Sequence, residues 1–213
     1  RNSDDYKTVL LIAQILAKRG FVVATGGGPG AMEAANLGAY LAEKNEQETE
    51  EAIKLIRTKA EGLDENAPEY LNVEAPKKVI ERFGYPDYMP SLGIPTWKYG
   101  HEPSNMFATW QAKFFSNALR EDGLIQVANC GIIYTPGSAG TRQEIFQDAC
   151  RNHYAEDGKA CPMVFYGCDF WTKNSVFDLV KNTAEGRPYK ELLLCSDDID
   201  EISNHFLAYC KEK

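Results

Sequence analysis

The stretch that decides the fold is Phe21-Val22-Val23-Ala24-Thr25-Gly26-Gly27-Gly28-Pro29-Gly30-Ala31. Its first four residues form a short apolar run that ends in a threonine and three glycines, which predicts a buried strand followed by a tight turn. A helical pattern opens directly after the turn, over residues 31–41. Before the strand, apolar residues recur at helical spacing over residues 6–18, and Gly20 marks the end of that helix. The stretch therefore predicts a helix, a strand, a glycine turn and a second helix in succession.

Strands and helices alternate along the rest of the chain in the same way. Further short apolar runs predict strands at residues 92–99, 131–134, 162–166 and 192–195. Helical patterns predict helices at residues 50–59, 76–82, 105–120, 141–152, 173–184 and 198–211. Because the strands are nearly continuous apolar runs, we expect an α/β fold, a Rossmann-like doubly wound parallel sheet with helices on both faces.

The length of 213 residues favours a single domain over residues 1–213. Residues 44–91 combine a charged run with scattered prolines and glycines, and we expect them to form an insertion, either a lid or an oligomer contact. The charged run itself is typical of a solvated helix face. Because the first pattern is a helix, the strand that usually opens such a sheet is expected to be missing or supplied elsewhere.

The composition excludes several classes of protein. Hydrophobic residues make up 44% and charged residues 25% of the chain, as in ordinary globular domains. The formal net charge of −8 disfavours non-specific nucleic-acid binding, which needs a basic surface. No apolar run approaches the roughly 20 residues that span a bilayer, and the first residues do not form a signal peptide. We therefore expect a cytoplasmic protein with no nucleic-acid or membrane partner.

The cysteines do not form a metal-binding or disulfide pattern. No Cys-x-x-Cys pair occurs, and the cysteines do not cluster with the three histidines. We expect most of them to be small apolar core residues. They occupy positions 130, 150, 161, 168, 195 and 210.

A second glycine turn, Pro136-Gly137-Ser138-Ala139-Gly140-Thr141, follows the predicted strand at residues 131–134. In a parallel α/β sheet the ligand crevice lies beyond the carboxyl ends of the strands, where both turns are expected. Glycine lets the backbone approach an anion, and the first amides of the following helix point toward it. We therefore expect residues 26–32 and 136–141 to converge on one phosphate. The predicted binding residues are Gly26, Gly27, Gly28, Gly30, Met32, Pro136, Gly137, Ser138, Gly140 and Thr141.

Two common nucleotide motifs fit poorly. Gly26, Gly28 and Ala31 match the relaxed dinucleotide fingerprint, but the acidic residue expected about 20 residues later falls in a helical charged run. The P-loop is excluded because Gly-Lys-Ser/Thr is absent. A glycine-rich turn can also be merely a tight connection between a strand and a helix.

Glu144 has two interpretations. It can close a capping box with Thr141 and complement the helix dipole, which is the ordinary reason for such spacing. Alternatively, its carboxylate faces the anion crevice and acts on a sugar.

The two turns together, Gly26-Gly27-Gly28-Pro29-Gly30-Ala31-Met32 and Pro136-Gly137-Ser138-Ala139-Gly140-Thr141-Arg142-Gln143-Glu144, resemble the LOG family and the related bacterial nucleotide 5′-monophosphate nucleosidases. LOG is named after the plant "lonely guy" cytokinin-activating enzyme. The resemblance covers most of residues 6–154. It implies a Rossmann-like fold, a homodimer or higher homo-oligomer, and no metal or nicotinamide cofactor. The implied reaction is hydrolysis of the N-glycosidic bond of a nucleoside 5′-monophosphate to free base and ribose 5-phosphate.

The resemblance also implies catalytic residues. It places the family's essential glutamate on Glu144, and the essential arginine matches Arg120 best, on the helix before the strand at residues 131–134. Lys113 is a rival for the cation, and another placement puts Asn117 at the position of the arginine. A carboxylate such as Glu144 can stabilise an oxocarbenium-like state and activate water. Arg120 would bind phosphate or ribose hydroxyls with its guanidinium fork.

Alternatives remain open. The chain could be a non-catalytic nucleotide or phosphorylated-cofactor binder, similar to molybdenum-cofactor carriers with comparable glycine turns. His101 and Glu102 could reach the crevice but are more typical of a polar loop. The aromatic residues Trp97, Tyr99 and Trp110 could stack on a base, although such spacings are more often those of core residues.

Overall fold

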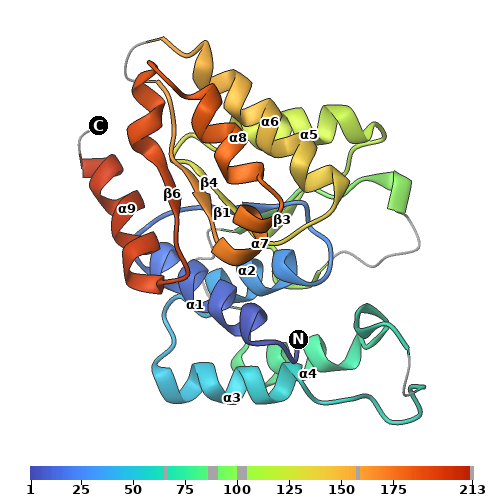
Figure 1. Ribbon diagram of the computed structural model, residues 1–213. Helices are drawn as coiled ribbons and strands as arrows, with labels where there is room; N and C mark the ends of the chain where they lie inside the picture. The colour runs from blue at the N-terminus through green and yellow to red at the C-terminus, as the bar shows by residue number, and fades with distance from the viewer. Residues whose placement is uncertain (65–66, 86–90, 100–104, 157–158, 212–213) are drawn as a thin grey trace. The chain divides into compact units, whose positions relative to one another are not determined.

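The computed structural model describes residues 1–64, 67–85, 91–99, 105–156 and 159–211 (Figure 1). The chain forms two compact units, Arg1–Arg120 and Glu121–Lys213. The boundary falls inside helix α5 (Asn117–Val127). The prediction of one domain over residues 1–213 stays a prediction.

The first unit holds a parallel sheet in the order β1-β2-β3. Val23 pairs with Ser91, and Leu92 pairs with Trp110. The elements of this unit before α5 are α1 (Asp4–Lys18), β1 (Val23–Thr25), α2 (Ala31–Tyr40), α3 (Glu46–Ile56), the 3-10 helix η1 (Glu69–Leu71), α4 (Glu74–Phe83), β2 (Ser91–Gly93), the 3-10 helix η2 (Trp97–Tyr99) and β3 (Trp110–Gln111).

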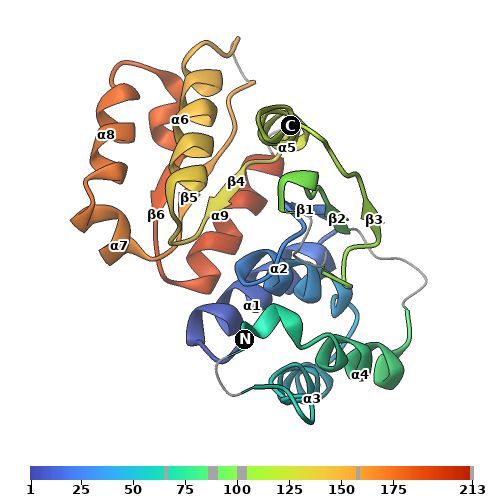
Figure 2. The same cartoon turned by 90° about the vertical axis from the view of Figure 1, so that its right-hand side faces the viewer.

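Helices α1 and α2 pack closely against each other in the first unit (Figure 2). The Ser3 hydroxyl caps α1 by accepting a hydrogen bond from the backbone amide of Tyr6 at 3.2 Å. Gly38 of α2 faces α1, where a Cβ would collide with the carbonyl oxygen of Leu10. The absence of a side chain at this glycine therefore sets how closely the two helices approach.

The predicted insertion at residues 44–91 contains α3 and α4, which pack against each other. Helix α3 begins with a reciprocal capping box: the amide of Glu48 donates to the Asn45 side chain, and the Glu48 carboxylate accepts from the amide of Asn45. Arg82 of α4 pairs with Glu51 of α3 at 2.6 Å. The charged run is thus the solvated face of a helix, as the sequence predicts.

The second unit holds a parallel sheet in the order β4-β5-β6. Large buried side chains, Tyr134, Phe165 and Trp171 among them, form its core. The indole nitrogen of Trp171 donates to the carbonyl of Tyr166 at 2.8 Å, so this buried polar group is satisfied. Beyond α5, the elements are β4 (Ile132–Tyr134), α6 (Ala139–His153), β5 (Met163–Phe165), α7 (Cys168–Lys173), α8 (Val176–Thr183), the 3-10 helix η3 (Pro188–Leu192), β6 (Leu193–Cys195) and α9 (Ile199–Lys211).

The predicted helix over residues 105–120 is wrong. Residues 105–109 contain a turn and a bend, residues 110–114 include β3 and an isolated bridge at Phe114, and a helix begins only at Asn117. The amides of Ala112 and Phe114 donate to the carbonyls of Gly93 and Pro95, each at 3.0 Å, so the backbone pairs with a distant strand. Aromatic residues at helical spacing also suit a strand, and non-local pairing decides between the two.

The other predicted elements are confirmed to within a few residues, with two adjustments. The strand expected at residues 92–99 is shorter, because it ends before Pro95 and continues as η2. The helix expected at residues 173–184 is α8, which follows Ser175 with its left-handed φ of 57°, and α7 before it was not predicted.

The prediction that most cysteines are core residues is wrong. The six cysteines are thiols outside any disulfide, and only Cys161 is buried. Cys150 is exposed although it lies on α6, because the neighbouring Ala149 and Asn152 occupy the buried side of that helix.

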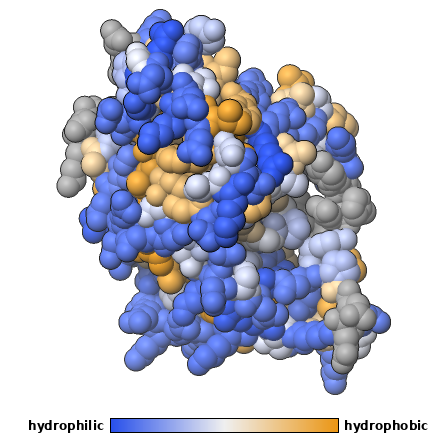
Figure 3. Space-filling model, viewed as in Figure 1, coloured by the Kyte–Doolittle hydropathy of each residue, from blue (hydrophilic) through white to orange (hydrophobic). Residues whose placement is uncertain are grey.

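The described residues therefore form a mixed α/β structure with two small parallel sheets of three strands each. Figure 3 shows that the visible surface is largely hydrophilic, with apolar side chains gathered in one area of the second unit. In the described part of the chain, no helix combines the length and the apolar character needed to span a bilayer.

Candidate functional site

The first glycine turn joins the carboxyl end of β1 to α2. Gly27 has a φ of +72°, and a Cβ on this residue would lie 2.9 Å from Cδ of Pro95. The amide of Gly27 donates to the hydroxyl of Thr25 at 3.0 Å. Glycine is required here both by the left-handed backbone and by the close approach of Pro95.

Buried side-chain amides hold this turn in place. The backbone amide of Asn105 donates to the carbonyl of Gly27 at 3.0 Å, and its side-chain amide donates to the carbonyl of Gly28 at 3.3 Å. The same side chain donates to Oδ1 of Asn36 at 3.0 Å, and that oxygen also accepts from the hydroxyl of Thr25 at 2.7 Å. A connected and buried polar network of this kind fixes a loop conformation. Nothing in the sequence identified Asn36 or Asn105 as part of the site.

Arg120 lies beside the first glycine turn, within the same unit. Its Nη1 is 3.1 Å from the position that a Cβ would take on Gly26, and Sδ of Met32 is 2.8 Å from that position. Nη2 of Arg120 donates to Oδ1 of Asn117 at 2.9 Å, one helical turn earlier on α5. The structure thus brings together the predicted residues Gly26, Met32 and Arg120, and it gives Asn117 the role of orienting the guanidinium.

The rival cation, Lys113, has different surroundings. Its Nζ lies 3.9 Å from the centroid of the Trp97 ring, and that ring stacks on Phe115 with the centroids 6.0 Å apart. Trp97 and Trp110 are 53% and 61% exposed, so the interpretation of these two as core residues is wrong. Lys113 therefore makes a cation–π contact with an exposed aromatic side chain on the protein surface.

We predict that Gly27→Ala destabilises the protein more than a glycine replacement in open space. Alanine at a left-handed position next to Pro95 should cost about 1–3 kcal/mol, because both the backbone and the neighbouring ring must shift. The matched control is Gly62→Ala, since Gly62 has a similar φ of +79° and no described atom lies within 4 Å of its Cβ position. Urea unfolding followed by circular dichroism measures both variants. Equal losses would show that the contact with Pro95 is unimportant.

The second glycine turn joins the carboxyl end of β4 to α6. The N-cap residue of α6 is Ser138, whose side chain makes no capping hydrogen bond to the described residues. A Cβ on Gly137 would collide with the side chain of Thr141, so that threonine folds back over the turn. Gly140 lies inside the first turn of the helix.

The capping-box interpretation of Thr141 and Glu144 is wrong. Helix α6 begins at Ala139, which places Thr141 at its third position and Glu144 in its second turn. The first turn of α6 contains no acidic residue. A capping box requires the N-cap residue and the residue three positions later, and here these positions belong to Ser138 and Thr141. The capping box therefore does not account for the position of the half-buried Glu144.

A second carboxylate, which the sequence analysis missed, borders the same helix. Glu121 is 2% exposed and accepts a hydrogen bond from Nε2 of Gln143 at 2.7 Å. Its Oε1 is 3.7 Å from the position that a Cβ would take on Gly140. A carboxylate near the first turn of a helix is stabilised by the helix dipole. The sequence alone does not indicate that Glu121 is buried, because this residue looks like one more charged residue of a surface helix.

Helix α6 is fixed to the sheet of the second unit by a buried polar group. Asp148 is fully buried, accepts a hydrogen bond from the hydroxyl of Tyr134 at 2.8 Å and pairs with Arg151 at 2.7 Å. Burial raises the pKa of Asp148 above its ordinary value, although Arg151 acts to lower it. Burial and the neighbouring carboxylate both raise the pKa of Tyr134. This anchor holds the helix that carries Glu144.

The predicted site residues fall into two groups. The first unit contains Arg120 and the predicted binding residues of the first turn, and the second unit contains Glu144 and those of the second turn. The convergence of the two turns on one phosphate stays a prediction. His101 and Glu102 lie outside the described residues. In the part of the chain that the structure describes, no cluster of three or more His, Cys, Asp or Glu side chains could hold a metal ion.

Comparison with protein-family models finds none that matches the chain, and comparison with curated proteins finds no match either.

Proposed function

We propose that this chain is a Rossmann-like nucleotide-binding protein that hydrolyses nucleoside 5′-monophosphates. In this reaction, water adds across the N-glycosidic bond and yields a free base and ribose 5-phosphate. Arg120 and the first turn bind the phosphate or the ribose, and Glu144 stabilises the oxocarbenium-like state and deprotonates water.

The observation that carries the proposal is the position of Arg120. A guanidinium 3.1 Å from the Cβ position of Gly26 and oriented by Asn117 is suited to bind an anion held at this turn. Guanidinium groups bind phosphate oxygens in a fork that lysine cannot reproduce. The N-cap of the adjoining helix α2 is Gly30, which has no side chain that could accept a hydrogen bond from the first amides of the helix. These first amides can therefore donate to the same anion.

The position of Glu144 supports the catalytic part of the proposal. A capping role is excluded because Thr141 and Glu144 both lie inside α6. Asp148, Tyr134 and Arg151 anchor that helix, which gives Glu144 a rigid support. Rigid positioning of a carboxylate is what a general base requires.

The test is incubation of the full chain with AMP, GMP, CMP and UMP, with chromatography of the free bases and a colorimetric assay of ribose 5-phosphate. We expect equal molar amounts of the two products from at least one nucleotide. Tight binding of a nucleotide without release of base would instead support a non-catalytic carrier. Absence of both binding and turnover would refute the proposal.

A further inference from the structure

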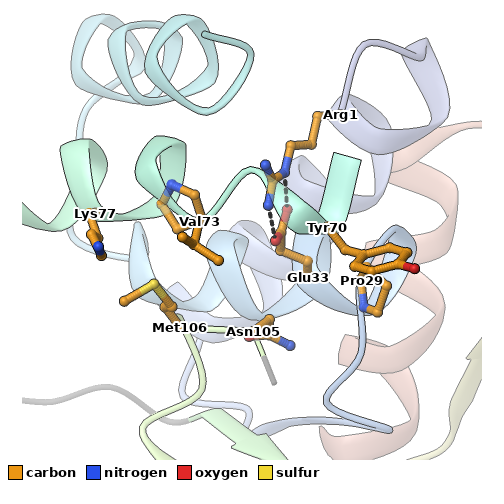
Figure 4. A pocket seen from close by; sticks show the side chains of 9 residues that line it. Arg1, Pro29, Glu33, Tyr70, Val73, Lys77, Asn105 and Met106 are labelled. Carbon is orange, nitrogen blue, oxygen red and sulfur yellow. Dashed lines mark hydrogen bonds and ion pairs between the residues drawn. The ribbon is translucent and has the colours of Figure 1, made fainter. Parts of the chain in front are cut away.

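A small pocket lies next to the first glycine turn, within the first unit (Figure 4). Its volume is about 180 Å³. Pro29 of the turn and Asn105, which bonds to the turn, both contribute to its wall. The other side comes from η1 and α4 of the predicted insertion, through Tyr70, Val73 and Pro76. The pocket therefore connects the candidate phosphate site to the insertion.

The charged groups of this pocket neutralise one another. Nε and Nη2 of Arg1 donate to the two carboxylate oxygens of Glu33 at 2.7 and 2.6 Å. The hydroxyl of Tyr6 donates to Glu33 as well, at 2.8 Å. Lys77 pairs with Glu74 at 2.6 Å. Because each cation already has a carboxylate partner, the pocket offers little attraction for a phosphate.

The remaining wall is mainly apolar. Figure 4 shows Tyr70 and Pro29 at one end of the pocket and Val73 and Met106 toward the other. Sites for whole small molecules usually occupy about 300–1,000 Å³, so a smaller pocket suits a single ring system. A flat, neutral and aromatic group gains most from such a wall, because bases stack on aromatic side chains.

We propose that this pocket receives the nucleobase of the nucleotide whose phosphate lies at the first glycine turn. This inference rests on the proposed function. It assigns the insertion a role in base recognition, through Tyr70 and Val73. Asn105 links the two subsites, because one residue lines the pocket and holds Gly27 and Gly28.

The experiment compares AMP with ribose 5-phosphate, which carries the same phosphate and sugar but no base. Val73 is 39% exposed and precedes α4, so Val73→Trp can fill the pocket with little strain on the core. The matched control is Leu71→Trp, at a residue that is 48% exposed and outside the pocket wall. All variants also carry Glu144→Gln, so that AMP is not consumed during calorimetric titration.

Val73→Trp should raise the Kd for AMP by about tenfold or more, since the ring of the base loses its buried surface. The Kd for ribose 5-phosphate should not change, and Leu71→Trp should change neither value. If Val73→Trp fails to fold, as judged by circular dichroism, Tyr70→Leu replaces it with the same expected pattern.

The outcomes separate the two proposals. Suppose that the Glu144→Gln protein binds AMP. If Val73→Trp then raises the Kd values for AMP and ribose 5-phosphate equally, or raises neither, only the base pocket is overturned. If neither compound binds and the wild-type chain releases no base, the proposed function and the base pocket both fail.

Discussion

Replacing Glu144 with glutamine should reduce the rate of base release by about 10²- to 10⁴-fold, the usual contribution of a general acid or base. Glutamine keeps the size of the side chain but cannot take a proton from water or carry the negative charge that stabilises an oxocarbenium-like state. Since Glu144 is half-buried in the second turn of α6 and has no capping role there, the protein should remain folded. Steady-state kinetics with the best nucleotide substrate measure the effect, and it should appear in kcat more than in KM.

The matched control for this variant is Glu156→Gln. Glu156 is an exposed carboxylate that pairs with Lys159 on the surface, so its loss should leave kcat unchanged. Glu121→Gln is the informative comparison, because Glu121 is the other carboxylate near the first turn of α6. If Glu121→Gln stops turnover and Glu144→Gln does not, the catalytic assignment moves to Glu121.

The elements on both sides of the glycine turns could be predicted because their signals are local. An apolar run followed by glycines marks the end of β1 before α2 and the end of β4 before α6, and all four elements lie within two residues of the predicted bounds. Hydrophobic periodicity predicts such elements well when the residues that decide them are neighbours in sequence.

The extended segment before α5 could not be predicted in this way. Its conformation depends on pairing between Leu92 and Trp110 and between Thr96 and Phe114, and these partners are far apart in the chain. Aromatic residues fit both a helix face and a strand, so the local pattern does not decide between them. Tertiary hydrogen bonds decide for the strand, and the helix begins only at Asn117.

The residues of the candidate site likewise divide into those that could be predicted from the sequence and those that could not. Gly27 and Glu144 belong to the two glycine-turn motifs of the sequence, whereas Arg120 was assigned only through the family resemblance, with Lys113 and Asn117 as rival positions. The support from Asn36 and Asn105 could not be predicted, because these two residues are 69 positions apart and their hydrogen bond exists only after folding. The buried position of Glu121 was hidden for a similar reason, since it depends on contact with Gln143 of another helix.

Arg120→Ala should raise the Kd for AMP by about 10- to 100-fold, because a hydrogen bond to a charged group contributes about 1.5–3 kcal/mol. The guanidinium beside Gly26 is oriented by Asn117, which favours bidentate contact with the phosphate. Arg120→Lys should restore only part of the affinity, because an ammonium group carries the charge without the fork. Calorimetric titration in the Glu144→Gln background measures both variants.

A phosphate contact can be separated from a structural role by comparing AMP with adenosine, which lacks the phosphate. If Arg120 binds the phosphate, Arg120→Ala should remove most of the preference for AMP over adenosine and leave the Kd for adenosine unchanged. If Arg120 had only a structural role, Arg120→Ala would raise the Kd values for AMP and adenosine together. Lys113→Ala serves as the control, because the Lys113 ammonium lies over Trp97 on the surface and its removal should alter neither Kd. A loss of AMP binding in Lys113→Ala as large as that in Arg120→Ala would contradict the choice of Arg120 as the phosphate-binding cation.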